Sequence, residues 1–150
     1  MKNMKDVKIC IVGLGYVGLP LAIAFADKFR VIGFDINPSR LSELHEDYDR
    51  TLEIHPDKLK LNKENIIYSS DIQSAKDCNI YIITVPTPID SANRPDLTPL
   101  LESSKTIGTV LSKNDIVIYE STVYPGATED KCVPVLENTS GLTFNKDFFC

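Results

Sequence analysis

The chain contains 150 residues, of which 43% are hydrophobic and 25% charged, and it carries a formal net charge of −5 at pH 7. This length and composition are typical of one globular domain with its own core, and the negative charge argues against a nucleic-acid-binding surface. No apolar run approaches the length of a membrane span, and residues 1–6 are polar, unlike a signal peptide. We therefore expect a cytoplasmic protein without a nucleic-acid or membrane partner.

The four cysteines follow no spacing that is typical of a metal site or a disulfide framework. Cys10 and Cys78 lie in or beside predicted buried strands, where cysteine commonly packs as a small apolar residue. His45 and His55 have no cysteine or acid at ligand spacing. The sequence therefore predicts a reduced protein without a metal site.

The first predicted elements are a strand, a glycine turn, a helix and a second strand. Residues 7–12 are apolar and lead into the sequence GLGYVG at positions 13–18. An apolar helical pattern covers residues 19–29, and residues 30–36 are again apolar and rich in β-branched side chains. Continuous apolar runs of this kind are typical of parallel strands that helices cover on both faces.

The glycine turn has the pattern G-x-G-x-x-G, which is typical of dinucleotide-binding folds. Gly13 permits the tight turn, Gly15 lets a pyrophosphate approach the backbone, and Gly18 lets the helix pack closely against the strands. The amides and dipole of the first helical turn then favour the phosphate charge. A glycine turn that only packs the βαβ unit, and binding of FAD, which uses the same fingerprint, are the alternatives.

An acid stands at the end of the second predicted strand. Asp35 lies about twenty residues after the glycine turn, where a carboxylate can accept both ribose hydroxyls of the adenosine. Because it would also repel a 2′-phosphate, the predicted cofactor is NAD rather than NADP.

A second predicted helix begins at Asn37 and Pro38, as N-cap and first helical residue. Arg40 lies one turn into this helix, close to the expected adenosine pocket, where it could stack on adenine or meet a phosphate. A solvated helix face is the alternative for Arg40. Residues 47–63 are polar and irregular, which predicts helical turns and a loop.

Three further elements follow: a strand at 64–69, a short helix at 71–77 that Asp71 could cap, and an apolar strand at 79–85. Pro86-Thr87-Pro88 ends this fourth strand, because proline cannot continue a hydrogen-bonded ladder. The carboxyl ends of parallel strands line the cofactor crevice. Thr87 is therefore expected to direct its hydroxyl or its amide at the dinucleotide, and a rigid turn is the alternative.

A polar loop at 89–96 precedes a long predicted helix, 98–112, with Thr98 as cap and Pro99 as first helical residue. The fifth predicted strand, Ile116–Tyr119, ends in a segment rich in hydroxyl groups, within which Thr122 is expected nearest the nicotinamide. A helix at 127–137 follows this segment.

Residues 141–150 predict a turn and a sixth short strand. Strands and helices alternate along the whole chain, and this alternation is typical of parallel sheets built from βαβ units. The predicted fold is therefore α/β, a Rossmann-type doubly wound, mostly parallel six-stranded sheet with helices on both faces.

Four motifs in this order, VGLGYVGLPLA, GFDINPSR, VPTPID with RPDLTPL, and YESTVYPGATE, resemble the UDP-glucose/GDP-mannose dehydrogenase family of nucleotide-sugar 6-dehydrogenases. The resemblance covers essentially the whole chain, as the family's N-terminal NAD-binding domain. It is greatest to the branch that oxidises UDP-N-acetylhexosamines for bacterial surface polysaccharides. The resemblance implies oxidation of the sugar's C6 alcohol to a carboxylate with two NAD⁺, through an aldehyde that a cysteine thiolate captures.

The resemblance also extends the expected cofactor site to residues that match the family's NAD contacts. Thr122 additionally matches the threonine that helps to orient a catalytic water. The complete expected site is Gly13, Gly15, Tyr16, Val17, Gly18, Asp35, Arg40, Pro86, Thr87 and Thr122.

The family's nucleophilic cysteine has no counterpart in these 150 residues. Cys150 stands ahead of the glutamate-bearing motif and is not that cysteine. Most of the UDP-sugar site and the long dimerisation helix of the family are also missing. We therefore expect residues 1–150 to be the NAD-binding domain of a longer, homodimeric enzyme, able to bind NAD but not to turn over.

Three other functions stay open on the sequence alone. The first is a stand-alone NAD(H)-binding module without chemistry, and the second is a UDP-glucose 6-dehydrogenase. The third is another Rossmann dehydrogenase, against which the STVYPGATE segment speaks. The sequence also leaves open the choice between gluco- and galacto-configured substrates.

Overall fold

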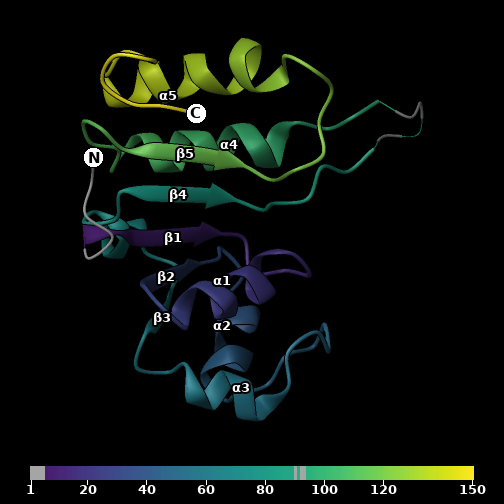
Figure 1. Ribbon diagram of the computed structural model, residues 1–150. Helices are drawn as coiled ribbons and strands as arrows, with labels where there is room; N and C mark the ends of the chain where they lie inside the picture. The colour runs from purple at the N-terminus through teal and green to yellow at the C-terminus, as the bar shows by residue number, and fades with distance from the viewer. Residues whose placement is uncertain (1–5, 90, 92–93) are drawn as a thin grey trace.

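The computed structural model describes residues 6–89, 91 and 94–150 as one parallel sheet with helices on both faces. The order across the sheet is β3-β2-β1-β4-β5, and all neighbouring pairs are parallel (Figure 1). The strands are β1 (Lys8–Val12), β2 (Arg30–Phe34), β3 (Ile66–Ser69), β4 (Ile80–Ile83) and β5 (Ile116–Tyr119). The predicted doubly wound α/β fold is thus confirmed.

The strand order reverses at β1. The chain winds from β1 through β2 to β3 on one side, and then places β4 and β5 on the other side of β1. In open α/β sheets, ligands bind at such a switch point, outside the carboxyl ends of the strands. The ends of β1 and β4 therefore mark the place to search for a site.

Among the described residues, five named helical segments lie between the strands and two more follow β5. They are α1 (Gly18–Ala26), α2 (Pro38–His45), α3 (Pro56–Leu61), the 3₁₀ helix η2 (Ile72–Ala75), α4 (Thr98–Gly108), the π-helical turn η3 (Thr128–Cys132) and α5 (Val133–Ser140). None of the helices in the described part of the chain has both the length and the apolarity that crossing a membrane requires. The polar residues 1–5 and part of the loop expected at 89–96 lie outside the described residues.

The two faces of the sheet bury separate cores, because alternate strand residues point in opposite directions. Cys10 and Val12 of β1 pack into a cluster with side chains of η2, α4 and α5. Ile9 and Ile11 pack into a second cluster with side chains of α1, α2 and α3. Both faces of β1 are therefore covered, which accounts for its continuous apolar sequence.

Local capping agrees with the sequence at two helices and differs at a third. The Asn37 side chain accepts from the amides of Ser39 and Arg40, and Asp71 caps η2 by accepting from the amide of Gln73. At α4 the expected cap was wrong. Thr98 is already helical, and its amide donates to Asp96 Oδ1 at 2.9 Å.

The helix expected at 127–137 begins as the π-helical turn η3. In this turn the Val133 amide donates a hydrogen bond to the carbonyl of Thr128, five residues earlier, as is typical of a π-helix. Pro134 follows at once and has no amide to donate. A widened turn before this proline lets the chain continue into α5.

The expected sixth strand is reduced to one bridge beside β5, so the sheet has five strands rather than six. The Phe149 amide donates to Asp115 O at 3.0 Å, and its carbonyl accepts from Val117 N at 2.8 Å. Just before it, Asn145 adopts φ +59 and donates to Phe148 O. This tight turn leaves too few extended residues for a longer ladder.

Phe148 and Phe149 form a matched pair for testing the role of this last segment. The Phe148 side chain is fully buried, whereas Phe149 is 41% exposed. Phe148→Ala should lower the free energy of unfolding by about 3–5 kcal/mol, since it removes a buried aromatic ring. Phe149→Ala should lower it by less than about 1 kcal/mol. Urea unfolding measures both, and equal losses would contradict the packing described here.

Candidate functional site

The glycine turn joins β1 to α1, and the protein's own packing explains two of its three glycines. Gly13 adopts φ +95, a conformation that side chains disfavour, and its amide donates to Phe34 O at 2.8 Å. A Cβ on Gly18 would overlap the carbonyl oxygen of Gly13. Both glycines are therefore required before any ligand is considered.

Gly15 has no such internal reason to be glycine. A Cβ there would meet no other atom within 4 Å, and the backbone is outside the left-handed region. Gly15 instead lines a cleft of about 400 Å³ at the first turn of α1. Among the described residues, no acceptor is found for the amides of Gly15, Tyr16 and Val17. An open space facing unpaired helix amides is what a bound phosphate group requires.

Asp35 follows β2 and fixes the glycine turn from the side. Its Oδ2 accepts from the Leu14 amide at 2.8 Å, and its Oδ1 accepts from the Asn37 amide at 2.9 Å. Each carboxylate oxygen has two acceptor positions, so one on each stays available for a further donor. Asp35 lines a second cleft, of about 590 Å³, together with Gly13 and Pro99.

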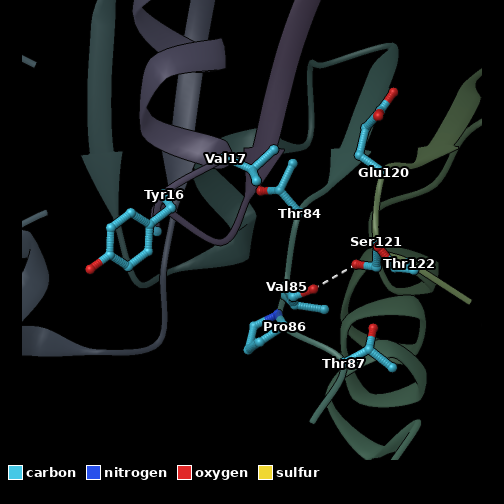
Figure 2. A pocket seen from close by; sticks show the side chains of 10 residues that line it. Tyr16, Val17, Thr84, Val85, Pro86, Thr87, Glu120, Ser121 and Thr122 are labelled. Carbon is cyan, nitrogen blue, oxygen red and sulfur yellow. Dashed lines mark hydrogen bonds between the residues drawn. The ribbon is translucent and has the colours of Figure 1, made fainter. Parts of the chain in front are cut away.

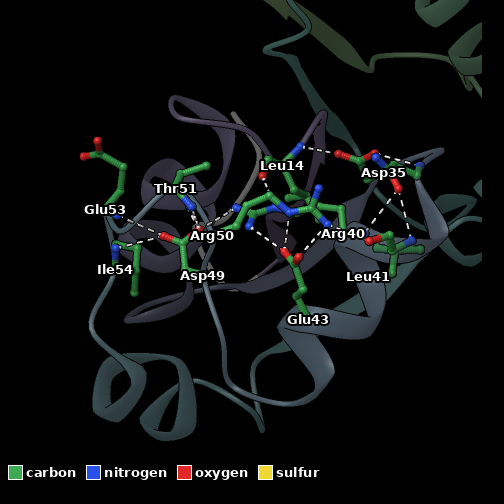
Figure 3. Close-up of polar contacts among 12 residues, drawn as sticks. Leu14, Asp35, Arg40, Leu41, Glu43, Asp49, Arg50, Thr51, Glu53 and Ile54 are labelled. Atoms are coloured by element: carbon green, nitrogen blue, oxygen red, sulfur yellow. Dashed lines mark hydrogen bonds and ion pairs between the residues drawn. The ribbon is translucent and has the colours of Figure 1, made fainter.

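Arg40 lies beneath the turn rather than in the cleft, so the expectation of a stacked or phosphate-binding Arg40 is not met in this structure. It is only 5% exposed. Its Nε donates to Leu14 O at 2.8 Å, and its guanidinium pairs with Asp49 at 2.8 Å and with Glu43 at 3.4 Å (Figure 3). The alternative of a solvated helix face is also wrong, since the side chain is buried.

Asp49 completes the network around Arg40. It is 2% exposed, and its carboxylate accepts from the amides of Thr51, Glu53 and Ile54 and from the Thr51 hydroxyl (Figure 3). Burial alone would raise the pKa of Asp49, but the bonds from Thr51, Arg40 and Ile54 together lower it. A buried ion pair with its remaining lone pairs satisfied in this way is held in one geometry.

The other wall of the site comes from the end of β4. Thr84 Oγ1 donates to Gly13 O at 2.7 Å and to Val12 O at 3.1 Å, which fastens this strand end to the glycine turn. The sequence reasoning missed Thr84. The signal was its register, because Ile83 pairs with Val12 and so places Thr84 opposite Gly13.

Thr87 carries a buried hydroxyl for which the described residues offer no hydrogen-bond partner. It lines the 400 Å³ cleft with Thr122, and Figure 2 shows its hydroxyl directed toward the Ser121–Thr122 segment. Ser121 itself donates to Val85 O at 2.6 Å and so ties the ends of β4 and β5 together. A buried hydroxyl without a partner is costly, so a ligand group is the natural partner for Thr87.

The two clefts adjoin, because Val85 and Pro86 line both of them. The structure therefore brings most of the expected site to one continuous groove at the switch point. Gly13, Asp35 and Pro86 line the larger cleft, while the smaller one is lined by Gly15, Tyr16, Val17, Pro86, Thr87 and Thr122. Gly18 and Arg40 lie behind this surface and shape it.

The cysteines lie away from both clefts. Cys10, Cys78 and Cys132 are buried, as the sequence predicted for the first two, and Cys150 is exposed. Burial raises the pKa of Cys78 to about 12, and it also raises the pKa of Cys10 and Cys132. No group of three or more His, Cys, Asp or Glu residues within 6–89, 91 and 94–150 could hold a metal ion.

Comparison with known protein families identifies the family to which the chain belongs. Residues 7–149 match the model of the UDP-glucose/GDP-mannose dehydrogenase family, NAD binding domain. The chain belongs to this family. NAD is thus the cofactor of the domain, as the glycine turn and Asp35 predicted.

Individual relatives cover nearly all of the chain. It is 58% identical over 146 residues to the UDP-N-acetyl-D-glucosamine 6-dehydrogenase of Pseudomonas aeruginosa, covering 97% of this chain and 34% of that protein. It is also 58% identical to Protein CapL of Staphylococcus aureus, covering 94% of this chain and 33% of that protein. The chain therefore spans about a third of the length of the curated relatives it matches.

Among solved structures, the chain is similar to a ternary complex of GDP-mannose dehydrogenase from Pseudomonas aeruginosa. The TM-score is 0.88 at 26% identity, over 93% of this chain and 34% of that one. The fold described above is thus shared with a GDP-mannose dehydrogenase.

Gly15 and Gly18 should respond differently to the same substitution. Gly15→Ala should leave the melting temperature within about 2 °C, since its Cβ meets no protein atom, but should weaken NAD⁺ binding at least about tenfold. Gly18→Ala should lower stability by several kcal/mol, because its Cβ overlaps the Gly13 carbonyl. Thermal melts and calorimetric titration measure both effects, and normal NAD⁺ binding by Gly15→Ala would contradict the phosphate site.

Asp49→Asn should destabilise the chain by about 3 kcal/mol at pH 7, because it removes the nearer of the two carboxylates that pair with the buried Arg40. The folded pKa of Asp49 is lowered, so its contribution is present above the unfolded pKa of about 3.9 and is lost as pH falls through the folded value. The difference in the free energy of unfolding between the unmodified chain and Asp49→Asn, measured with urea, should therefore become smaller below about pH 4. Asp57→Asn is the control, since its side chain is 78% exposed, and it should change little.

Proposed function

We propose that this chain is the cofactor domain of a nucleotide-sugar 6-dehydrogenase that oxidises the C6 alcohol of a UDP-N-acetylhexosamine to the uronic acid. The observation that carries the proposal is the 58% identity, over 97% of the chain, to a UDP-N-acetyl-D-glucosamine 6-dehydrogenase. The similarity to CapL adds support for a role in capsule or O-antigen polysaccharide biosynthesis. The domain boundaries proposed are 1–150, within a longer protein that is a homodimer.

NAD⁺ would lie along the groove at the ends of β1, β4 and β5. Its pyrophosphate fits the open space at Gly15, where the amides of Gly15, Tyr16 and Val17 have no acceptor among the described residues. The ribose hydroxyls fit the acceptor positions that Asp35 keeps after bonding Leu14 and Asn37. The nicotinamide end fits the smaller cleft, beside the hydroxyls of Thr87 and Thr122.

NAD⁺ supplies a hydride acceptor for both oxidation steps. The chain's own residues hold that acceptor in place, which converts an encounter between two molecules into a reaction within one complex. Tyr16 and Val17, 69% and 56% exposed, would cover the cofactor from the helix side. For Thr122, which is exposed and lines the cleft, we propose the supporting role of orienting a water.

The nucleophilic cysteine of the second step is proposed to lie outside these 150 residues. The buried thiols have raised pKa values, so they are poor sources of thiolate at neutral pH. Residues 1–150 should therefore bind NAD⁺ and not turn over. The substrate-reading residues are proposed to lie outside this domain as well.

Arg40 acts through the turn in this proposal and does not touch the cofactor. Its bond to the Leu14 carbonyl, together with the bond of Asp35 to the Leu14 amide, fixes the two peptide groups that flank Leu14. These groups lie between the proposed pyrophosphate and ribose sites. Binding is stronger when such a geometry is held in advance.

The proposal predicts a defined pattern of cofactor and sugar preference. Calorimetry on this chain should give tighter binding of NAD⁺ than of NADP⁺. Asp35→Ala should lower the affinity for NAD⁺ more than the affinity for NADP⁺, so that the two affinities become more similar. The longer protein should form about two NADH per UDP-N-acetylglucosamine or UDP-N-acetylgalactosamine, and act more slowly on UDP-glucose.

Three outcomes would contradict this proposal. Equal affinity for NAD⁺ and NADP⁺ would remove the role given to Asp35. Binding of NAD⁺ by a longer protein that oxidises none of these UDP-sugars would favour the stand-alone NAD(H)-binding module, and faster oxidation of UDP-glucose would favour a UDP-glucose 6-dehydrogenase.

A further inference from the structure

Glu120 is the one formally charged side chain among the described residues that line the smaller cleft. It follows β5 directly, and its amide donates to Ile83 O at 2.9 Å, so its backbone is fixed to the neighbouring strand. The other lining residues are neutral: Gly15, Tyr16, Val17, Thr84, Val85, Pro86, Thr87, Ser121 and Thr122. The wall of this cleft thus carries a single negative charge.

This carboxylate is not used by the fold. Within the described part of the chain, Glu120 makes no side-chain hydrogen bond and no ion pair, and it is exposed. Figure 2 shows Glu120 and Thr87 at opposite ends of the lining group, with Ser121 and Thr122 between them and the Glu120 carboxylate directed away from all three. An exposed side chain without a partner can change its rotamer, so Glu120 is free to turn toward a ligand that lies between the ends of β4 and β5.

The groove is electrically polarised as a result. At Gly15 the first turn of α1 offers partial positive charge, while at Glu120 the wall offers a negative one. A ligand matches this arrangement when an anionic group lies at the helix and a cationic group lies at Glu120. NAD⁺ has that order of charges, because its nicotinamide ring is cationic, whereas the ring of NADH is neutral.

We propose that Glu120 makes the domain discriminate between the two oxidation states of its cofactor, favouring NAD⁺ over NADH. This inference rests on the proposed function, which places the nicotinamide end in the smaller cleft. The carboxylate attracts the cationic ring before hydride transfer and loses that attraction afterwards. Release of the reduced cofactor is thereby eased after each oxidation step.

The size of the effect follows from the exposure of Glu120. Ion pairs at exposed positions change an equilibrium by a factor of about two to five, since water screens them. The effect should shrink as salt is raised from about 0.05 M to about 0.5 M, because the screening length falls.

The test compares Glu120→Gln with the unmodified chain by calorimetric titration of NAD⁺, NADH and ADP-ribose. NAD⁺ affinity should fall about two- to fivefold, while NADH and ADP-ribose, which lack the cationic ring, should bind as before. Glu129→Gln is the matched control, since it removes the same charge from an exposed residue that does not line the cleft. It should leave the ratio of NAD⁺ to NADH affinity unchanged.

Equal weakening of NAD⁺ and NADH by Glu120→Gln would overturn this inference and leave the proposed function standing, because the side chain would then serve both oxidation states alike. An unchanged NAD⁺ affinity would overturn it too. If the unmodified chain bound none of the three ligands, the assignment of the groove as a cofactor site would be contradicted. The proposed function would then be contradicted as well.

Discussion

The structure of this site depends on one residue, Leu14, whose two flanking peptide groups are each held by a charged side chain. The Leu14 amide donates to Asp35, and the Leu14 carbonyl accepts from Arg40. Arg40 is in turn held by Asp49, which is buried and bonded to the backbone that follows it. The Arg40–Asp49 ion pair thus stabilises both the loop between α2 and α3 and the glycine turn. The shape of the groove therefore depends on an ion pair that does not line it.

The three glycines of the turn serve different purposes. Gly13 and Gly18 are needed by the fold, one for its backbone conformation and one for the close approach of α1 to the turn. Gly15 has no such role in the fold, because a Cβ there would meet no atom within 4 Å, and the role proposed for it is to leave room for the cofactor. A sequence pattern treats the three alike, and only the surroundings of each Cα separate the structural requirement from the requirement for a ligand.

Local features of the sequence predicted most of the fold and much of the site. The glycine turn, the Asn37 cap and the strand Ile116–Tyr119 depend on neighbouring residues, so pattern and spacing suffice for them. Arg40 could not be placed in this way, because its partner Asp49 lies in an irregular loop whose path is set by the side chain's own hydrogen bonds. The prediction of a sixth strand was wrong because the turn at Asn145, which the sequence pattern did not indicate, shortens the extended segment.

The double use of Asp35 limits how the cofactor preference of this domain can be redesigned. A cofactor preference is usually changed to NADP⁺ by removing the acid that repels the 2′-phosphate. In this chain the Asp35 carboxylate also accepts hydrogen bonds from the amides of Leu14 and Asn37. A neutral replacement without an acceptor would release the turn as it admits the new ligand. Successful redesign would have to provide a second acceptor for Leu14, so stability and cofactor choice would need to be changed together.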